Sequence, residues 1–570
     1  MPSPNPEPAL SATPRRHDLD ALRAMAMLLG IVLHAALSFF DTPIWPVQDR
    51  SRAPALGLVV MAIHGFRMPL FFLLSGYFTA MLAQRRGLAG LLSHRAKRIA
   101  LPLAVGMVTV VPLVWGVSIW AQSSATTPTS KTAEGAPATD LDIWTAAAVG
   151  NIDALRRHHE DGSDPNALDP TYRMNPLAWA VVGDQPDAVT HLLEAGADPA
   201  AAYGDGNTPL HTACFFGRAD AAKRLIDAGA PVNVRSPAGE TPADTMRHGK
   251  GTTDFIAGLL RISVDFEQVQ AGREEIRAIL AAGPTPVDTS PPPNQLIRLV
   301  KGLLFDFPVF HHLWFLWFLC WLVPGYALVA LLIRPFKGIR LPRAITVFAS
   351  PPACLLWLVP LTMLAQWPMN AGGTQVGFGP DTSAGLLPIP RVLAYYAIFF
   401  GAGAMLYTAR GATARLGRGW WLTLPLAIAV LVPAMSLCLK TPWPPALAQA
   451  LAGHATTVHV LAVAGQSLYA WLMIFGLIGL LECALSRERV GVTGGVRYLS
   501  DASYWLYVAH LPLIIAAQIL VRNLDLPAAV KLPLIVLITT GVLLASYQLM
   551  VRYTAIGRML NGPRTRRTGP

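Results

Sequence analysis

About ten apolar segments of roughly 20 residues each divide this 570-residue chain and constrain its fold more than any other feature. They lie at residues 19–40, 57–82, 99–120, 308–333, 345–366, 391–409, 420–439, 456–481, 502–521 and 532–552. Because the core of a bilayer offers backbone groups no water, a segment of this length crosses it as a helix. A composition that is 53% hydrophobic and 14% charged excludes disorder and an ordinary soluble enzyme. The sequence therefore predicts an all-α fold, a polytopic membrane helix bundle of about ten spans within a lipid bilayer.

The Lys and Arg residues between the apolar segments gather in alternate loops. The rich loops are residues 83–98, 334–344, 410–419 and 482–501. Because loops rich in Lys and Arg stay in the cytoplasm, both termini are expected there, and the protein is expected in a bacterial inner membrane. The same placement explains the formal net charge of +11, so no nucleic-acid partner is expected.

A polar block at residues 140–283 follows the third apolar segment and repeats with a period of 33 residues. The hexapeptide TPLHTA, which begins at Thr208, matches the ankyrin signature in full, and related hexapeptides begin at Asp142, Asn175 and Thr241. We expect four units and a further partial unit in GREEIRAILAAG, forming an inserted soluble ankyrin-repeat solenoid that binds a protein partner. An insert that follows three spans is expected to lie outside the cytoplasm.

The remaining segments are interpreted as tails and linkers around two membrane parts. The membrane parts are residues 19–120, with spans one to three, and residues 303–553, with spans four to ten. The other regions are a disordered N-terminal tail at 1–18, a polar linker at 121–139, a Pro-rich linker at 284–302 and a basic C-terminal tail at 554–570.

Two polar residues in the first apolar segment are the leading candidates for function. Arg23 and His34 are eleven residues apart, which places them on one helix face with a rise of about 16 Å between them. An Arg at the centre of a bilayer costs roughly 2.5–3.5 kcal/mol on insertion scales. Residues of this kind normally face the interior of a bundle and serve a function.

Other polar residues share helix faces within later segments. His64 and Arg67 are three residues apart in the second segment, and Ser503, Tyr507 and His510 follow one face of the ninth. Hydrogen bonds between helices are the structural alternative for each of them.

Three further groups lie at the ends of segments. His312 and Trp314 begin the fourth segment, where an aromatic belt is the structural alternative, and Arg95 and Arg98 precede the third. The two arginines also fit a plain excess of positive charge in the cytoplasm. Asp501 is expected to cap the ninth helix.

These segments together resemble the acyltransferase-3 family of integral membrane acyltransferases. The family pattern of Arg or Lys, ten residues and then His is matched by Arg23 and His34, and its R-x-x-R pattern by Arg95 and Arg98. The stretches RAMAMLLGIVLH, HGFRMPLFFLLSGYF, HLWFLWFL and YLSDASYWLYVAHLPL look most like the branch that succinylates osmoregulated periplasmic glucans. The ankyrin insert departs from the family pattern.

The resemblance implies an O-acyltransferase that moves an acetyl or succinyl group from a cytoplasmic donor, acyl-CoA as co-substrate, to a hydroxyl of an extracytoplasmic glycan. His34 would act as a general base or would accept the acyl group covalently. No metal and no permanently bound cofactor are expected. The implied catalytic residues are His34, Arg23, His64 and Arg67, and the implied substrate- or donor-binding residues are Arg95, Arg98, His312, Trp314, Ser503, Tyr507 and His510.

Two other functions fit the same sequence. Intramembrane Arg and His also mark the substrate paths of transporters. In a membrane-anchored interaction or sensor protein, the ankyrin units would be the working part. Loss of residues 140–285 would then abolish function while the polar residues of the membrane part would be dispensable.

Overall fold

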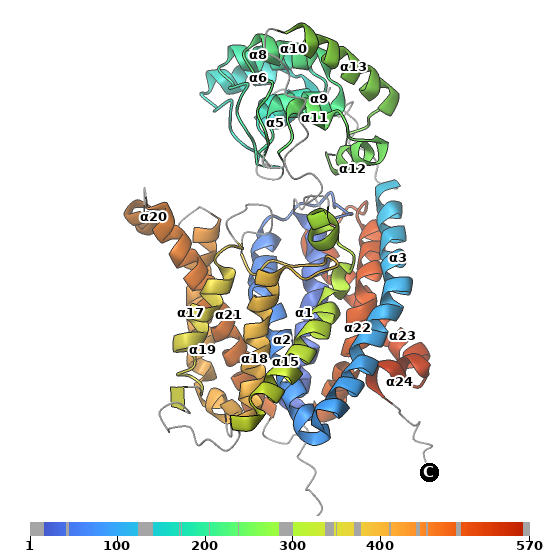
Figure 1. Ribbon diagram of the computed structural model, residues 1–570, viewed down its shortest axis with the longest axis vertical. Coiled ribbons are helices and arrows are strands. Elements are labelled where there is room, and N and C mark those ends of the chain that lie inside the picture. The colour runs from blue at the N-terminus through green and yellow to red at the C-terminus, as the bar shows by residue number, and fades with distance from the viewer. Residues whose placement is uncertain are drawn as a thin grey trace, which may run out of the picture. The chain divides into compact units, whose positions relative to one another are not determined.

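The computed structural model divides into two compact units, and each is described by itself. One unit comprises residues 1–40, 49–117 and 303–570, and the other comprises residues 41–48 and 118–302. Within the described residues every regular element is a helix, as the all-α prediction requires (Figure 1). The structure describes residues 16–40, 45–123, 141–169, 172, 174–204, 206–236, 239–260, 262–283, 300–336, 347–348, 350–369, 378–409, 412–439, 445–451, 454–485 and 492–562.

The first unit is a bundle of long apolar helices (Figure 1). Short 3₁₀ or π segments extend or connect several of them. The elements are α1 (His17–Ala36), η1 (Leu37–Phe39), α2 (Ala55–Arg95), η2 (Ala96–Ala100), α3 (Leu101–Ser123), η4 (Gly302–Asp306), η5 (His311–Leu313), α15 (Trp314–Leu332), η6 (Arg334–Phe336), α17 (Leu355–Gln366), α18 (Pro390–Thr408), α19 (Ala412–Cys438), α20 (Pro445–Leu451), α21 (Ala455–Leu485), α22 (Val492–Val521), α23 (Ala528–Ser546), η7 (Tyr547–Val551) and α24 (Ala555–Asn561).

Seven helices among the described residues are long and apolar enough to cross a membrane. One of them, at Ala55–Ala121, covers the second and third predicted spans. The fifth predicted span corresponds to the 12-residue α17 and the sixth to the 19-residue α18, neither of which is among the seven. A membrane helix bundle is thus confirmed, and the count of ten spans stays a prediction.

The segment predicted as a loop at residues 83–98 is helical in the structure. Gly87 interrupts α2 with a φ of 68°, a conformation that is open to glycine and strained for other residues. The π segment η2 then leads directly into α3. Arg95 and Arg98 are therefore held on helical backbone at the junction of α2 and α3.

Glycines allow α2 and α18 to approach closely. A Cβ atom on Gly76 would lie 1.8 Å from the backbone oxygen of Phe400, and one on Gly403 would lie 1.8 Å from that of Leu73. Small residues at such contacts let membrane helices pack backbone to backbone. The aromatic core of the bundle begins beside this contact, where the rings of Phe72 and Tyr396 lie with their centroids 4.4 Å apart.

The second unit contains paired helices at the predicted ankyrin period (Figure 1). Thr208 begins the third pair with a capping box, in which His211 Nδ1 accepts a hydrogen bond from the Thr208 backbone N–H over 3.1 Å. His211 Nε2 lies 3.0 Å from the carbonyl oxygen of Glu240 and links this unit to the next. The helices are α5 (Ile143–Val149), α6 (Ile152–Glu160), α7 (Pro176–Val182), α8 (Pro186–Glu194), α9 (Pro209–Phe216), α10 (Ala219–Asp227), α11 (Pro242–Thr245), α12 (Lys250–Leu260) and α13 (Phe266–Ala282).

The end of the solenoid differs from the prediction of a further partial unit. Helix α13, which contains GREEIRAILAAG, packs against α9 and α10 and serves as the second helix of the fourth unit. Its Gly272 approaches the backbone of Gly217, and its fully buried Arg273 donates to the carbonyl oxygens of Phe215 and His248. Helix α12 is then an insertion between the two helices of that unit, and its Ala257 packs in a cluster with side chains of α7 and α9.

The predicted tails and linkers lie largely outside the described residues. These parts are residues 1–15, 124–140, 284–299 and 563–570. The predicted basic C-terminal tail begins, however, with the helix α24, whose last residue Asn561 donates from Nδ2 to the carbonyl oxygen of Asp501 over 2.8 Å.

Candidate functional site

Two histidines from distant parts of the chain form the centre of the site. His34 Nδ1 on α1 lies 3.0 Å from His510 Nε2 on α22, and the two rings stack with centroids 5.1 Å apart. His510 is 1% exposed and His34 is partly buried. Gln518, two turns further along α22, donates to the carbonyl oxygens of His34 and Ala35 and secures the end of α1.

A third histidine completes the cluster. His312 lies in η5, with its ring perpendicular to that of His510 and a centroid separation of 5.3 Å. His312 Nε2 lies 3.0 Å from the carbonyl oxygen of Val508, and Tyr507 donates its hydroxyl to the carbonyl oxygen of His312 over 2.6 Å. Three of the predicted binding residues are therefore brought together with His34.

Arg67 brings a positive charge to the cluster, whereas His64 is directed elsewhere. The guanidinium of Arg67 packs against Gly30, one helical turn before His34, where an added Cβ would lie 2.0 Å from Nη1. Arg67 is 8% exposed, and its Nε is buried without a hydrogen-bond partner in the described structure. His64 Nε2 lies 2.9 Å from the carbonyl oxygen of Pro380, which fits a structural hydrogen bond.

Arg23 lies on the same helix as His34 but belongs to a separate polar group. Its Nη2 donates to the backbone oxygen of Ser500 over 2.7 Å and to the Ser500 hydroxyl over 2.6 Å. The same hydroxyl donates to Asp20, which also lies 3.8 Å from the guanidinium of Arg23. Since Arg23 meets Ser500 and His34 meets His510, α1 and α22 run parallel and in register.

The structure corrects one sequence expectation and shows the contacts of two further predicted residues. Asp501 lies inside α22, nine residues after Val492, and therefore does not cap that helix. Trp314 is 8% exposed and packs with Phe72 and Tyr396 in the core, and its predicted binding role stays a prediction. Ser503 donates to the carbonyl oxygen of Ser500 within its own helix.

The two predicted donor-binding arginines lie at the junction of α2 and α3. Arg95 donates to the hydroxyl of Thr79 over 3.0 Å, and Arg98 donates to the carbonyl oxygen of Leu560 on α24 over 3.0 Å. Tyr504, one turn beyond Ser500 on α22, donates to the carbonyl oxygen of Arg98 over 2.6 Å. This hydrogen bond connects the junction to the part of α22 that contacts Arg23.

A basic hollow of about 580 Å³ opens at this junction. Arg98 is the one predicted binding residue among those that line it. Sequence reasoning missed Arg558, because residues 554–570 were interpreted as a tail, although the Ala-Ile-Gly-Arg-Met-Leu run after Thr554 gave a helix signal. The lining residues are Arg86, Gly90, Ser93, His94, Lys97, Arg98, Leu101, Arg558 and Met559.

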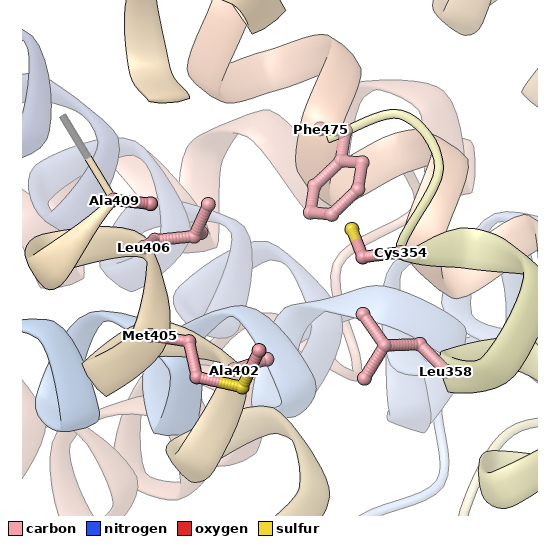
Figure 2. Close-up of a pocket in the computed structure, with 7 residues that line it drawn as sticks. All are labelled: Cys354, Leu358, Ala402, Met405, Leu406, Ala409 and Phe475. Atoms are coloured by element: carbon pink, nitrogen blue, oxygen red, sulfur yellow. The ribbon is translucent and has the colours of Figure 1, made fainter. Parts of the chain in front are cut away.

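A second, much smaller crevice has a different character. It lies among α17, α18 and α21 and is lined by Cys354, Leu358, Ala402, Met405, Leu406, Ala409 and Phe475 (Figure 2). None of these side chains carries a charge, so the crevice offers nothing to hold a charged substrate. Among the residues searched in the described part of the chain, no group of His, Cys, Asp or Glu has the geometry to hold a metal ion.

Comparison with known proteins identifies two kinds of sequence in this chain. The model of a family described as an acyltransferase domain matches residues 16–151 and 274–551, which is more than half of the chain. A family model of three ankyrin repeats matches residues 143–236. A stretch of 101 residues is 40% identical to the glucans biosynthesis protein C of Salmonella paratyphi B, Salmonella heidelberg and Salmonella enteritidis PT4. That stretch covers 18% of this chain and 25% of the length of these relatives.

Proposed function

Since this chain belongs to the acyltransferase-3 family, we propose that it transfers an acetyl or succinyl group from a cytoplasmic acyl-CoA to a hydroxyl of an extracytoplasmic glycan. The name of the relatives, glucans biosynthesis protein C, supports a glycan acceptor. The single observation that carries the proposal is the parallel pairing of α1 and α22, which puts a basic group at one depth and a histidine cluster at another.

The basic hollow is the proposed entry site of the donor. Arg86, Lys97, Arg98 and Arg558 are the cationic side chains that line it, and guanidinium groups pair well with phosphate oxygens. CoA carries phosphates at one end and the acyl thioester at the other. The phosphate end would lie in the hollow while the acyl end extends into the bundle past Arg23.

The histidine cluster is the proposed site of acyl transfer. His34 takes the proton from the acceptor hydroxyl, whose oxygen attacks the thioester carbonyl carbon and forms the new C–O bond. The C–S bond then breaks, and His34 passes its proton to the departing thiolate, so CoA leaves as the thiol. The positive charge of Arg67 lies beside the cluster and would stabilise the oxyanion that forms on the carbonyl oxygen.

The depth of the two groups supports this division of roles. Arg23 and His34 are separated by about 16 Å along α1, a large part of the thickness of a bilayer core. A chain that crosses a bilayer back and forth runs in the same direction in its first and ninth spans. The parallel course of α1 and α22 agrees with this. We propose on this basis that both termini are cytoplasmic, in a bacterial inner membrane, and that the ankyrin solenoid lies at the acceptor side and recruits a protein partner.

The proposal is tested by His34→Ala and Arg23→Ala in the full chain, at equal amounts in the membrane. Mass spectrometry of cell-surface glycans would follow the acetyl or succinyl increment. In a strain that lacks the native gene, we expect the unaltered chain to restore the increment and His34→Ala to leave it absent. Near-normal acylation by His34→Ala would refute the catalytic assignment.

A second experiment tests the topology. A reporter that is active only outside the cytoplasm, inserted within residues 140–283, is expected to be active. Activity of a cytoplasmic reporter at the same position would overturn the proposed side of the ankyrin solenoid.

A further inference from the structure

We propose that His510 is a positioning residue that fixes the tautomer of His34, and that Pro512 makes this arrangement possible. The inference rests on the proposed function, because it assigns His34 the role of base. It adds which nitrogen of His34 acts and why α22 carries a proline two residues after His510.

The position of the protons follows from the acceptors around the two rings. His510 Nδ1 lies 2.7 Å from the carbonyl oxygen of Tyr507. A carbonyl oxygen can only accept, so His510 Nδ1 carries a proton and donates it. In a neutral imidazole the other nitrogen then holds a lone pair, and this is the Nε2 atom that faces His34.

The same reasoning extends to His34. Its Nδ1 lies 3.0 Å from the lone pair of His510 Nε2 and must therefore carry a proton. The lone pair of a neutral His34 then lies on Nε2, the nitrogen on the far side of the ring. The guanidinium of Arg67 packs one helical turn before His34, so a second positive charge on either ring would be repelled.

Pro512 leaves the carbonyl oxygen of Val508 available to His312, the third histidine of the cluster. In a regular helix the backbone N–H of residue 512 would donate to the carbonyl oxygen of Val508, but proline has no N–H. His312 Nε2 lies 3.0 Å from that oxygen and donates to it instead. The ring of His312 is then held against the ring of His510, which keeps the His510 ring aligned with His34.

The consequence for the reaction is a defined direction of proton transfer. His34 Nε2 receives the proton of the acceptor hydroxyl, and His510 accepts the hydrogen bond from His34 Nδ1 throughout. The ring of His510 thus supplies the acceptor that orients His34 as a base.

The first test measures the tautomer directly. The full chain in lipid bilayers, labelled with ¹⁵N-histidine, would be compared with His34→Gln to assign the His34 signals in NMR spectra. We expect a protonated Nδ1 and an unprotonated Nε2 at neutral pH, and the reverse pattern in His510→Leu. An unprotonated Nδ1 in the unaltered chain would overturn the inference even if His34→Ala is inactive. If the expected tautomer is seen but His34→Ala remains active, the proposed function fails and the tautomer assignment stands.

The second test measures transfer, with succinyl-CoA and a glucose oligosaccharide as probes. His510→Leu removes the acceptor for His34 Nδ1–H, and we expect kcat to fall about 100-fold. His510→Gln keeps an acceptor oxygen and is expected to restore at least a tenth of the activity, with the acid limb of the pH–rate profile moved. Equal loss in both variants, with the pH profile unchanged, would show a merely structural role and refute the inference.

Pro512→Ala provides a milder perturbation. It returns an N–H that competes with His312 for the Val508 oxygen, and we expect kcat to fall about tenfold at an unchanged KM for the donor. Pro533→Ala, in the interior of α23, is the matched control and is expected to leave kcat unchanged. The same kcat in the two proline variants would contradict the role of Pro512.

Discussion

Substitution of Gly30 by alanine would move Arg67 without removing its charge. The added Cβ would lie 2.0 Å from Nη1 of Arg67, and ordinary contact begins at 3.4 Å, so the guanidinium must retreat by about 1.4 Å. The obstructing atom is the far end of a flexible side chain, so the fold can adapt. Alanine also gains roughly 0.5–1 kcal/mol over glycine within a helix, which offsets the cost.

The expected result is a loss of catalysis at nearly constant stability. A misplacement of about 1 Å at a reacting centre can lower a rate by about 100-fold, and we expect a fall of this order in kcat. The assay is acyl transfer in membranes, with thermal unfolding of the same preparations by tryptophan fluorescence. Gly541→Ala is the control, because an added Cβ there meets nothing within 4 Å. A kcat equal to that of the control would refute the placement of Arg67 at the reacting centre.

Three further predictions concern separate parts of the molecule. Gly76→Ala places a Cβ against the rigid backbone of Phe400, so we expect a loss of about 1–3 kcal/mol in stability, measured by denaturant or thermal unfolding in detergent. Arg558→Ala is expected to raise the KM for acyl-CoA about tenfold. Arg552, whose guanidinium lies over the ring of Tyr498 and outside the hollow, provides the control, and Arg552→Ala is expected to leave the KM unchanged. Equal KM values in the two variants would contradict the donor site. Burial raises the pKa of the Cys214 thiol to about 12, so at pH 8 the thiolate is scarce, and alkylation followed by mass spectrometry should label the exposed Cys483 and leave native Cys214 unmodified.

Local patterns in the sequence predicted much of this protein correctly. Segment length and polarity predict membrane helices because the bilayer imposes a minimum length and a low tolerance for charge. A period of 33 residues predicts ankyrin units because each unit repeats the same caps and turns. Asn175, Thr208 and Thr241 each begin one of the repeated hexapeptides, and each accepts a hydrogen bond from the first turn of its helix.

The predictions failed where one local sequence pattern is compatible with two different positions in the folded chain. The segment GREEIRAILAAG has the periodicity of a second ankyrin helix, but the insertion of α12 before it hid the unit to which it belongs. Asp501 looks like a helix cap because apolar residues follow it, yet α22 begins nine residues earlier. Residues 554–562 were predicted as part of a basic tail, but they form a short helix that contacts Arg98 and Asp501.

The spacing of Arg23 and His34 was enough to predict that they share a helix face, because local backbone geometry sets the spacing of a helix. It did not determine the partner of either residue. His34 meets His510, 476 positions away, and Arg23 meets Ser500, 477 positions away, because α22 packs parallel to α1. Which face of α22 meets α1, and hence which nitrogen of His34 carries the proton, depends on contacts among helices that are distant in the chain. No local pattern encodes those contacts.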